Sequence, residues 1–289
     1  MAFRTVIVKN RCKLEYSLNY LVCRGEEEKR ILLDEIEFLI IQNTGVSITC
    51  ALLSALTEKK IKVIFCDGKS NPQSELTPYF NNYSNYKKIK QQISFNDEIK
   101  NQLWSIIITK KIYYQSQVLK AVGNDNYKKL EQYITEIQIG DITNREGHAA
   151  KVYFNSLFGG QFSRGDDFNP INKYLNYGYS IIASAINREI KLLGYLTELG
   201  IHHIGETNPF NLSYDFIEPL RPFIDIQVVK KRVNDENYKD YFIKLLSSQV
   251  IVNGNKMFLD NAIHLYIQSL FTALTKEKLE DVIFIDYEL

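Results

Sequence analysis

The stretch IHHIGETNPFNLSYDFIEPLRP, residues 201–222, gathers most of the chemically reactive side chains of this chain. It contains two adjacent imidazoles and two carboxylates that can turn inward from one face of a helix. These residues are His202, His203, Asp215 and Glu218. A shorter polar stretch upstream, NREGH at 144–148, is its counterpart. The chain is organised around these two stretches.

The composition is that of an ordinary globular protein. The chain has 289 residues, of which 45% are hydrophobic, so it can bury a core without disulfides. A net charge of +1, from 35 basic and 34 acidic residues, gives no bulk attraction to nucleic acid or membranes. The cysteines form no Cys-x-x-Cys pair and lie in apolar runs, which favours buried, reduced thiols. With no signal peptide and no apolar run of ~20 residues, we expect a cytoplasmic protein without a membrane partner.

The first quarter of the chain is β-rich. Short runs of Val, Ile, Tyr and Leu at strand length are separated by Asn and Gly, and one helix is expected from 51 to 59. The expected strands are 4–8, 13–17, 20–24, 30–33, 37–41, 47–50 and 62–66. Loop-forming residues between 67 and 77 predict a linker. We therefore expect an α+β protein with a small β-rich domain at 1–70 and a larger helical domain at 71–289.

Beyond the linker, apolar residues recur at spacings of three and four. A long helix is predicted from Asp97 to Val122, with Asn96 as its cap. The other expected helices are 126–139, 145–158 capped by Thr143 or Asn144, 171–199, 211–220 and 261–275. The pair Asn253-Gly254 between strand-forming residues predicts a hairpin.

Glu146 stands in the first turn of an expected helix. A glutamate there often only complements the helix dipole, and this interpretation stays open. The turn is unusually polar, however, and the small Ala149 and Ala150 that follow would let another segment approach closely. Glu146 is therefore a candidate site residue.

Three histidines lie near these carboxylates. His148 follows Glu146 by two residues, about 200° around a helix, so the two cannot serve one site from the same face. We expect a structural role for His148. His202 and His203 would point to opposite sides of an extended segment, so only one of them can be a ligand.

Asp215 and Glu218 share one face of the helix expected at 211–220, and a proline directly after Glu218 can redirect its carboxylate. An ordinary acidic helix face with a proline break explains the pattern equally well. If Glu146, His203 and Glu218 converge, two carboxylates and one imidazole surround an open cation position. That donor set suits Mg²⁺ or Mn²⁺ better than structural zinc, and it would support phosphodiester chemistry.

At these residues the chain resembles the CRISPR-associated integrase family, the catalytic subunit (CRISPR-associated protein one) of the spacer-acquisition complex. The resemblance covers essentially the whole chain, and the long segment from His203 to Glu218 is most similar to the type II-A branch. The matching stretches are FRTVIV (3–8), VIFCD (63–67), NREGHAAKVYF (144–154), NPINKYLNYGYSII (169–182), GIHH (200–203) and DFIEPLRP (215–222).

The resemblance implies that Glu146, His203 and Glu218 are catalytic ligands of Mg²⁺ or Mn²⁺. It implies a DNA endonuclease and integrase that inserts captured fragments, or spacers, into a CRISPR array by 3′-OH attack on phosphodiesters. It also implies that the domain at 1–70 forms a homodimer and that the domain at 71–289 is catalytic. The implied partners are double-stranded DNA, CRISPR-associated protein two in a heterohexamer, the effector nuclease and accessory adaptation proteins.

Several basic residues are candidates for DNA contact because phosphates attract local positive charge and aromatic rings stack on bases. A lysine-rich run is usually only a solvated face, and an arginine beside a ligand can simply hold a carboxylate. The candidates are Lys87, Lys88 and Lys90 with Tyr83 and Tyr86, the pair Lys110-Lys111, the run Lys230-Lys231-Arg232, and Arg145, Arg164 and Arg221.

Two alternatives remain open from the sequence, and one further motif carries an expectation. The protein could be a non-catalytic DNA-binding scaffold of the adaptation complex rather than an enzyme, although all three implied ligands are present. The motif Tyr177-Gly178-Tyr179 is expected to pack beneath the site rather than to act in it. The strand-like segment 282–289 could add an edge strand to a partner or close a sheet of this protein itself.

Overall fold

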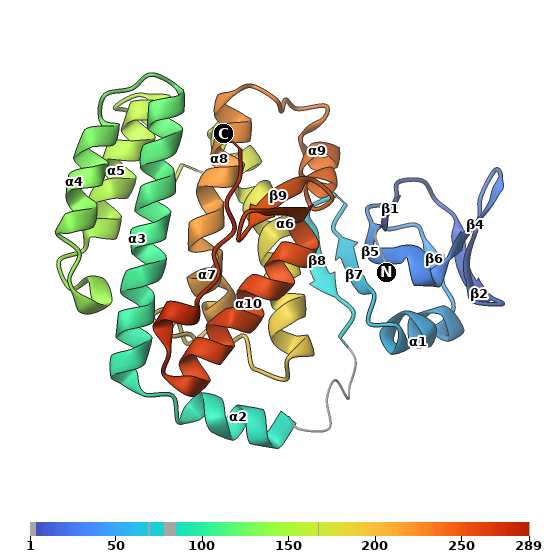
Figure 1. Cartoon of the computed structure of the whole chain (residues 1–289). Coiled ribbons are helices and arrows are strands. Elements are labelled where there is room, and N and C mark those ends of the chain that lie inside the picture. Colours follow the sequence, from blue (N-terminus) through green and yellow to red (C-terminus); the bar gives the residue numbers. More distant parts are fainter. Residues whose placement is uncertain (1–3, 69, 78–84, 167, 289) are drawn as a thin grey trace. The chain divides into compact units, whose positions relative to one another are not determined.

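The computed structural model of the chain describes residues 4–68, 70–77, 85–166 and 168–288 (Figure 1). The chain divides into two compact units, 1–81 and 82–289, of which the first is rich in strands and the second is helical. This confirms the predicted α+β fold. The separate roles expected for domains 1–70 and 71–289 stay predictions. Phe3 and Tyr83, named above for the resemblance and the basic cluster, lie outside the described residues.

Two four-stranded sheets make up the described part of the first unit, with the strand orders β1-β5-β7-β8 and β4-β3-β2-β6. β5 lies parallel to both β1 and β7, and its sequence, apolar except for Glu37, fits a strand covered on both faces. The elements are β1 (Arg4–Val8), β2 (Lys13–Ser17), β3 (Tyr20–Arg24), β4 (Glu28–Leu32), η1 (Leu33–Glu35), β5 (Ile36–Ile41), β6 (Ser47–Ile48), α1 (Cys50–Glu58), β7 (Lys62–Cys66) and β8 (Pro72–Glu75).

The core of this unit forms where α1 packs against the sheets, around Leu14, Leu39, Leu52 and Val63. The seven predicted strands are all present, to within a few residues at their ends. The four cysteines are free thiols as predicted, but only Cys66 is buried, so the expectation that all four are buried was wrong.

The predicted linker at 67–77 is only partly a loop. Pro72–Glu75 forms β8, which pairs antiparallel with β7 and extends the first sheet. An ion pair between the buried Lys62 on β7 and Glu75 on β8 joins the two strands. Loop-forming residue types did not reveal this strand, because its stabilising partners lie on β7.

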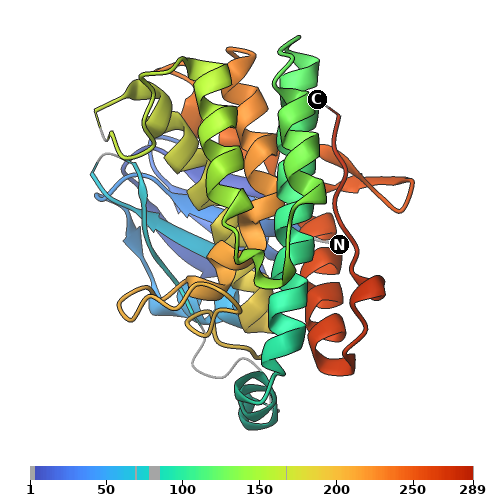
Figure 2. The same cartoon turned by 90° about the vertical axis from the view of Figure 1, so that its left-hand side faces the viewer.

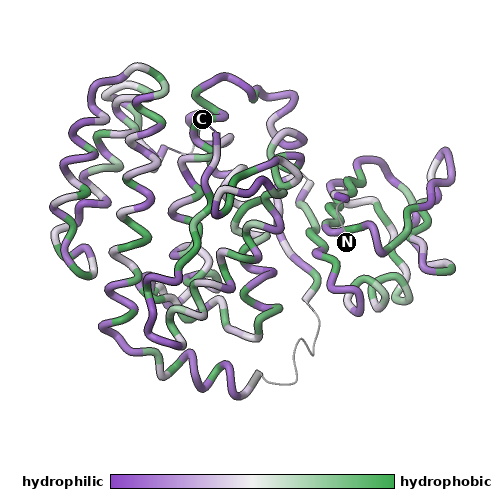
Figure 3. The backbone as a smooth tube through the Cα atoms, in the orientation of Figure 1, coloured by the Kyte–Doolittle hydropathy of each residue, from purple (hydrophilic) through white to green (hydrophobic). Residues whose placement is uncertain are grey.

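The second unit consists of helices and one hairpin. Figure 3 shows hydrophobic residues concentrated on its inner helices and on the C-terminal segment, whereas the outer helix α4 is mainly hydrophilic. The elements are α2 (Asn85–Ile93), α3 (Asp97–Ala121), α4 (Tyr127–Thr135), η2 (Ile139–Asp141), α5 (Arg145–Phe158), α6 (Pro170–Leu192), α7 (Asn211–Ile217), η3 (Glu218–Leu220), α8 (Arg221–Val229), α9 (Tyr238–Leu245), β9 (Gln249–Val252), β10 (Asn255–Phe258), α10 (Leu259–Lys276) and η4 (Leu279–Asp281).

α3 is the central helix of this unit and runs along its whole length (Figures 1 and 2). Asn96 caps it as predicted, accepting a hydrogen bond from the N–H of Glu98 at 2.9 Å. α4 and α5 pack on α3, as do η3, α8 and α10, so buried residues occur on most of its circumference. α3 thereby lies between the two elements that carry Glu146 and Glu218.

Three predicted helices end earlier than expected. α6 stops at Leu192 rather than at Leu199, because Gly194 adopts a φ of +84° and turns the chain. α4 stops at Thr135, and α7 ends at Ile217, where η3 and its proline begin. The hairpin at Asn253-Gly254 and the final helix are confirmed.

The C-terminal segment packs on its own chain. Asp286 pairs with Ile251 of β9 through two backbone hydrogen bonds of 2.8 Å. The hydroxyl of Tyr114 on α3 donates to the carbonyl of Ile285 at 2.7 Å, and the hydroxyl of Tyr287 donates to the carbonyl of Pro219 at 3.3 Å. Of the two alternatives for this segment, the structure therefore supports closure of the protein's own sheet. No helix in the described ranges is long and apolar enough to cross a membrane.

Candidate functional site

Glu146 is positioned by a doubly capped helix start. Asn144, at a left-handed φ of 51°, accepts from the N–H of Gly147 at 3.1 Å. The buried Asp141 accepts from the N–H groups of Arg145 and Glu146 at 2.8 and 2.9 Å. These caps satisfy the first amides of α5 and fix the direction in which Glu146 leaves the helix.

Glu218 lies at the break between α7 and α8, as the first residue of the short η3 turn, and Pro219 follows it. Its side chain is 4% exposed, and Arg221 donates to it through Nε at 2.8 Å. Burial alone would raise the pKa of Glu218, but the positive charges of Arg221 and Lys111 outweigh burial and lower it to about 2. The carboxylate is therefore ionised and held rigidly, as a cation ligand needs to be.

Lys111 of α3 joins the two carboxylates. Its Nζ donates to Oε1 of Glu146 at 2.6 Å and lies 2.5 Å from Oε2 of Glu218. The second contact is therefore also a close ion pair. Burial lowers the pKa of Lys111, but the charges of Glu218 and Glu146 raise it more, and the residue carries its charge. Two carboxylates from α5 and η3 thus converge on one cation.

His203 lies in the loop that joins α6 to α7. Asp215, 0% exposed, accepts from the N–H groups of Ile201, His202 and His203 at 2.7, 3.1 and 3.0 Å. Nδ1 of His203 lies 2.6 Å from Oδ1 of the same carboxylate. Because a carboxylate only accepts, Nδ1 carries the proton, and Nε2 is the nitrogen that can bind a metal.

The His203 ring lies within the electrostatic field of both predicted carboxylate ligands. Its hydrogen bond to Asp215 raises the pKa of His203, burial opposes that rise, and the charges of Glu218 and Glu146 add to it. The three predicted ligands therefore share one electrostatic neighbourhood. Close packing helps to fix this loop, since a Cβ at Gly200 would lie 2.2 Å from the carbonyl oxygen of His203.

His202 and His203 do not point to opposite sides, because the segment is not extended, which was the condition for that arrangement. The ring of His202 stacks on Trp104 with centroids 4.0 Å apart, and His203 meets the same indole edge-on at 5.7 Å. The reason is Asp215, which draws consecutive N–H groups to one carboxylate and so bends the backbone. His148 is exposed and lies beside Tyr133, and the structural or supporting role expected for it stays a prediction.

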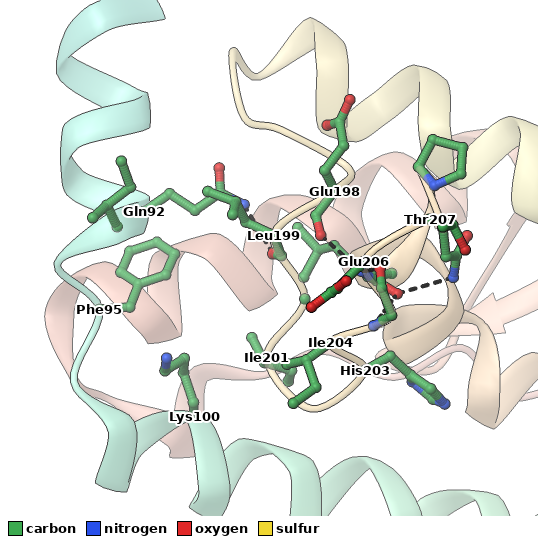
Figure 4. A pocket seen from close by; sticks show the side chains of 17 residues that line it. Gln92, Phe95, Lys100, Glu198, Leu199, Ile201, His203, Ile204, Glu206 and Thr207 are labelled. Carbon is green, nitrogen blue, oxygen red and sulfur yellow. Dashed lines mark hydrogen bonds between the residues drawn. The ribbon is translucent and has the colours of Figure 1, made fainter.

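A cavity of about 550 Å³ adjoins this loop, between residues 92–100 and residues 198–212. Figure 4 shows Gln92, Phe95 and Lys100 facing the loop, and the imidazole of His203 at one end, directed away from them. The side chain of Asn211 organises the loop by donating to the carbonyls of Glu198 and Gly205 at 3.1 and 2.8 Å. The cavity makes the loop around His203 accessible to a ligand.

The motif Tyr177-Gly178-Tyr179 packs beneath the site, as expected. A Cβ at Gly178 would lie 2.5 Å from Ile224, so α6 and α8 touch at this glycine. The buried hydroxyl of Tyr179 donates to Asp225, and the guanidinium of Arg221 lies 4.7 Å from the centre of the Tyr179 ring. The motif therefore supports the residue that holds Glu218.

The basic residues proposed for DNA contact fall into two groups. Most of them already pair within the protein: Lys88 donates to Tyr195 at 3.1 Å, Arg145 lies 3.0 Å from Glu136, Arg164 donates to Asn176 at 2.6 Å, and Arg221 holds Glu218. Exposed candidates are Lys87, Lys90, Lys230 and Lys231, and Arg232 is also exposed but donates to Gln227 at 2.8 Å. Lys111 is 6% exposed, so the suggestion that the Lys110-Lys111 pair forms a DNA-binding surface was wrong for Lys111.

Whether these residues suit a divalent metal can be tested on the donors present. No three His, Cys, Asp or Glu side chains within 4–68, 70–77, 85–166 and 168–288 already form a metal cluster. The ammonium of Lys111 nevertheless lies between Glu146 and Glu218, in the position that a metal ion would need. Nε2 of His203 is the ring nitrogen whose lone pair could bind that ion. Two carboxylates and one imidazole fit Mg²⁺ or Mn²⁺.

Lys111 is the site residue that the sequence reasoning did not assign to the site. The signal was present, because Lys111 continues the apolar stripe of Ile107, Ile108 and Ile112 on α3. A lysine at such a position is buried, and a buried lysine needs acidic partners.

Comparison with known proteins gives agreeing results for sequence and fold. The family described as "CRISPR associated protein Cas1" matches residues 5–259. The chain is 35% identical over 284 residues to the CRISPR-associated endonuclease Cas1 of Neisseria meningitidis serogroup C (strain 8013), covering 95% of this chain and 93% of that protein.

Two solved structures share the fold. A casposase bound to integration product has a TM-score of 0.76 at 18% identity, covering 95% of this chain and 91% of that one. A Cas6-RT-Cas1--Cas2 complex has a TM-score of 0.74 at 16% identity, covering 97% of this chain and 36% of that one.

Proposed function

The chain belongs to the CRISPR associated protein Cas1 family, and from this premise we propose that it is a divalent-metal-dependent DNA endonuclease and integrase. In this proposal it inserts captured DNA fragments into a CRISPR array by transesterification. The observation that supports it most is the convergence of Glu146 and Glu218 on one cation, beside an imidazole whose Nε2 is available. The Neisseria relative is named an endonuclease, and the casposase structure contains an integration product.

Glu146, His203 and Glu218 would hold the metal ion. When bound, Mg²⁺ or Mn²⁺ neutralises charge on the phosphate and activates the attacking oxygen. Asp215 keeps the proton on Nδ1 of His203, which leaves Nε2 as the lone-pair donor, and Arg221 keeps Glu218 ionised and in place.

The proposed reaction conserves the number of phosphodiester bonds. The 3′ oxygen of the captured fragment forms a bond to a phosphorus at the end of a CRISPR repeat. The bond from that phosphorus to the 3′ oxygen of the nucleotide that flanks the repeat breaks, and this oxygen takes up the proton that the attacking 3′-OH gives up. Because one bond replaces another, the joining step needs no nucleotide hydrolysis. The same site with water as the attacking group would cut DNA.

We propose that DNA phosphates contact the exposed Lys87 and Lys90 on α2, where positive charge faces solvent. Lys88, Arg145, Arg164 and Arg221 also stay predicted DNA contacts, although each already holds a group of the protein. Alanine at a phosphate-contacting lysine would weaken DNA binding for all sequences and reduce its salt dependence.

The proposed partners follow from the family. They are double-stranded DNA as captured fragment and as leader-repeat, a second copy of this chain joined through the N-terminal unit, and CRISPR-associated protein two in a heterohexamer. The Cas6-RT-Cas1--Cas2 structure is an assembly whose name includes both Cas1 and Cas2. The effector nuclease, accessory adaptation proteins, assignment to type II-A and a cytoplasmic location stay predictions.

A non-catalytic DNA-binding scaffold is the second candidate. The observation in its favour is the Lys111 ammonium, which neutralises both predicted carboxylate ligands from within the protein. A site that is permanently neutralised in this way would not bind a metal ion.

Strand transfer separates the two functions. A short duplex with 3′-OH ends is incubated with a supercoiled plasmid that carries a leader and repeat, with CRISPR-associated protein two present, in Mn²⁺, Mg²⁺ or EDTA. We expect joining in either metal by wild type and by the matched control His148→Ala, and no joining in EDTA or by His203→Ala. Equal joining by His203→Ala would refute the assigned site. DNA binding without joining under every condition would establish the scaffold.

A further inference from the structure

Lys111 occupies the position between the two predicted carboxylate ligands. It reaches this position from α3, whereas Glu146 belongs to α5 and Glu218 to η3, so one ammonium links three elements. The lysine is 6% exposed, and the Glu218 side chain is buried with it. Such a buried cation is stable only because the two carboxylates compensate its charge.

The ammonium and a divalent ion need the same oxygens. Lys111 contacts Oε1 of Glu146 and Oε2 of Glu218, whereas Arg221 takes the other oxygen of Glu218, Oε1, at 2.8 Å. A second cation placed within about 4 Å of the ammonium would be repelled strongly in a partly buried site. While Lys111 and Arg221 are in place, both oxygens of Glu218 are therefore occupied, and a metal ion bound by Glu218 must displace Lys111.

We propose that Lys111 is a built-in placeholder for the metal: it holds Glu146 and Glu218 together before metal binds and must leave them when metal binds. This inference rests on the metal site of the proposed function. Lysine suits the task because its charge is a compact ammonium on a flexible four-carbon stem. Arg221 can stay on Glu218 throughout, because its guanidinium uses a different oxygen. Only molecules in which Lys111 has left the carboxylates can then bind the metal ion. The apparent affinity for metal is reduced in proportion to the fraction of such molecules.

Substitution of the lysine tests the placeholder. Lys111→Met keeps an unbranched, flexible side chain that is one atom shorter, and it removes the charge. Lys110→Met is the matched control, because Lys110 precedes it on the same helix and pairs with Asp286 at 3.1 Å instead. Mn²⁺ affinity is measured by titration calorimetry on the full chain, and the thermal unfolding midpoint is measured in EDTA and in saturating Mn²⁺. His203→Ala serves as the variant that lacks one metal ligand.

The placeholder makes two linked predictions for Lys111→Met. Mn²⁺ affinity rises by about tenfold or more, since the competing cation is gone. The midpoint in EDTA falls below that of wild type, because the two carboxylates then repel each other, and saturating Mn²⁺ restores it. Lys110→Met binds Mn²⁺ as wild type does. An unchanged or weaker affinity in Lys111→Met would overturn the placeholder, whereas equal affinity of wild type and His203→Ala would overturn the metal site itself.

A second measurement uses the wild-type chain and so does not depend on whether a variant folds. Lysine amines are methylated reductively in EDTA and in Mg²⁺, and the modified peptides are quantified by mass spectrometry. We expect Lys111 to react about tenfold faster in Mg²⁺, because the ion displaces it from the carboxylates, and Lys110 to react equally in both. The same rate for Lys111 in EDTA and in saturating Mg²⁺ would also overturn the placeholder.

Discussion

Substitution of Asp215 by asparagine should destabilise the protein more than its conservative shape suggests. Oδ2 of Asp215 accepts the N–H groups of Ile201 and His202, and Oδ1 accepts the N–H and the Nδ1–H of His203. An amide keeps one of the two oxygens, so two of these four donors would face an NH₂ group in either orientation. The carboxylate is 0% exposed, so water cannot replace the lost acceptor.

The size of the effect follows from the number of donors left unpaired. Each buried donor without an acceptor costs about 1–3 kcal/mol, so Asp215→Asn should lower the free energy of unfolding by about 2–6 kcal/mol. Because Asp215 also orients the His203 ring, Mn²⁺ affinity should fall by about 10–100-fold.

Urea unfolding at neutral pH measures the first effect, and titration calorimetry measures the second. The control is Glu206→Gln, the same change from carboxylate to amide at an exposed position of the same loop. That variant should stay within about 0.5 kcal/mol of wild type. An Asp215→Asn protein with the unfolding free energy of the control would refute the idea that this carboxylate organises the loop.

Three further predictions concern the same region. Burial raises the pKa of Glu218, but the charges of Arg221 and Lys111 have the larger effect and lower it from 4.5 to about 2. The ionised carboxylate therefore contributes its full stabilisation above pH 4.5, and this stabilisation is lost as the pH falls toward 2. Urea unfolding across that range should show this loss in wild type and not in Glu218→Gln, and identical profiles would contradict it. Gly200→Ala places a methyl group 2.2 Å from the carbonyl oxygen of His203 and should cost about 1–3 kcal/mol, whereas a wild-type thermal midpoint would show that the loop adjusts freely. Tyr287→Phe removes the hydrogen bond to the carbonyl of Pro219 and should lower the free energy of unfolding, measured in urea, by about 0.5–1.5 kcal/mol. An unchanged free energy of unfolding would show that the C-terminal segment does not dock there.

Local sequence signals predicted the elements well where each element is determined by its own residues. The strands of the first unit and the capped start of α3 follow from residue type and spacing. The end of α6 could not be predicted from residue type and spacing, because apolar residues continue at helical spacing after Leu192. Gly194 could have indicated the end, since glycine is the residue that most readily adopts the positive φ that terminates a helix.

The candidate site could be predicted only in part. The acidic and histidine residues were found through motifs, but their arrangement depends on contacts between distant segments. Asp215 bends the backbone of a loop more than ten residues before it, and Lys111 meets carboxylates from α5 and η3. A lysine in the apolar stripe of α3 indicates burial, yet nothing in its own helix identifies which acids compensate its charge.

The most direct test of the account is a crystal structure of the full chain grown in Mn²⁺, with the metal located by anomalous diffraction. We predict one Mn²⁺ bound by Glu146, Nε2 of His203 and Glu218, with Lys111 withdrawn from both carboxylates. Mn²⁺ at other residues only, or Lys111 still between the two carboxylates at saturating Mn²⁺, would contradict it.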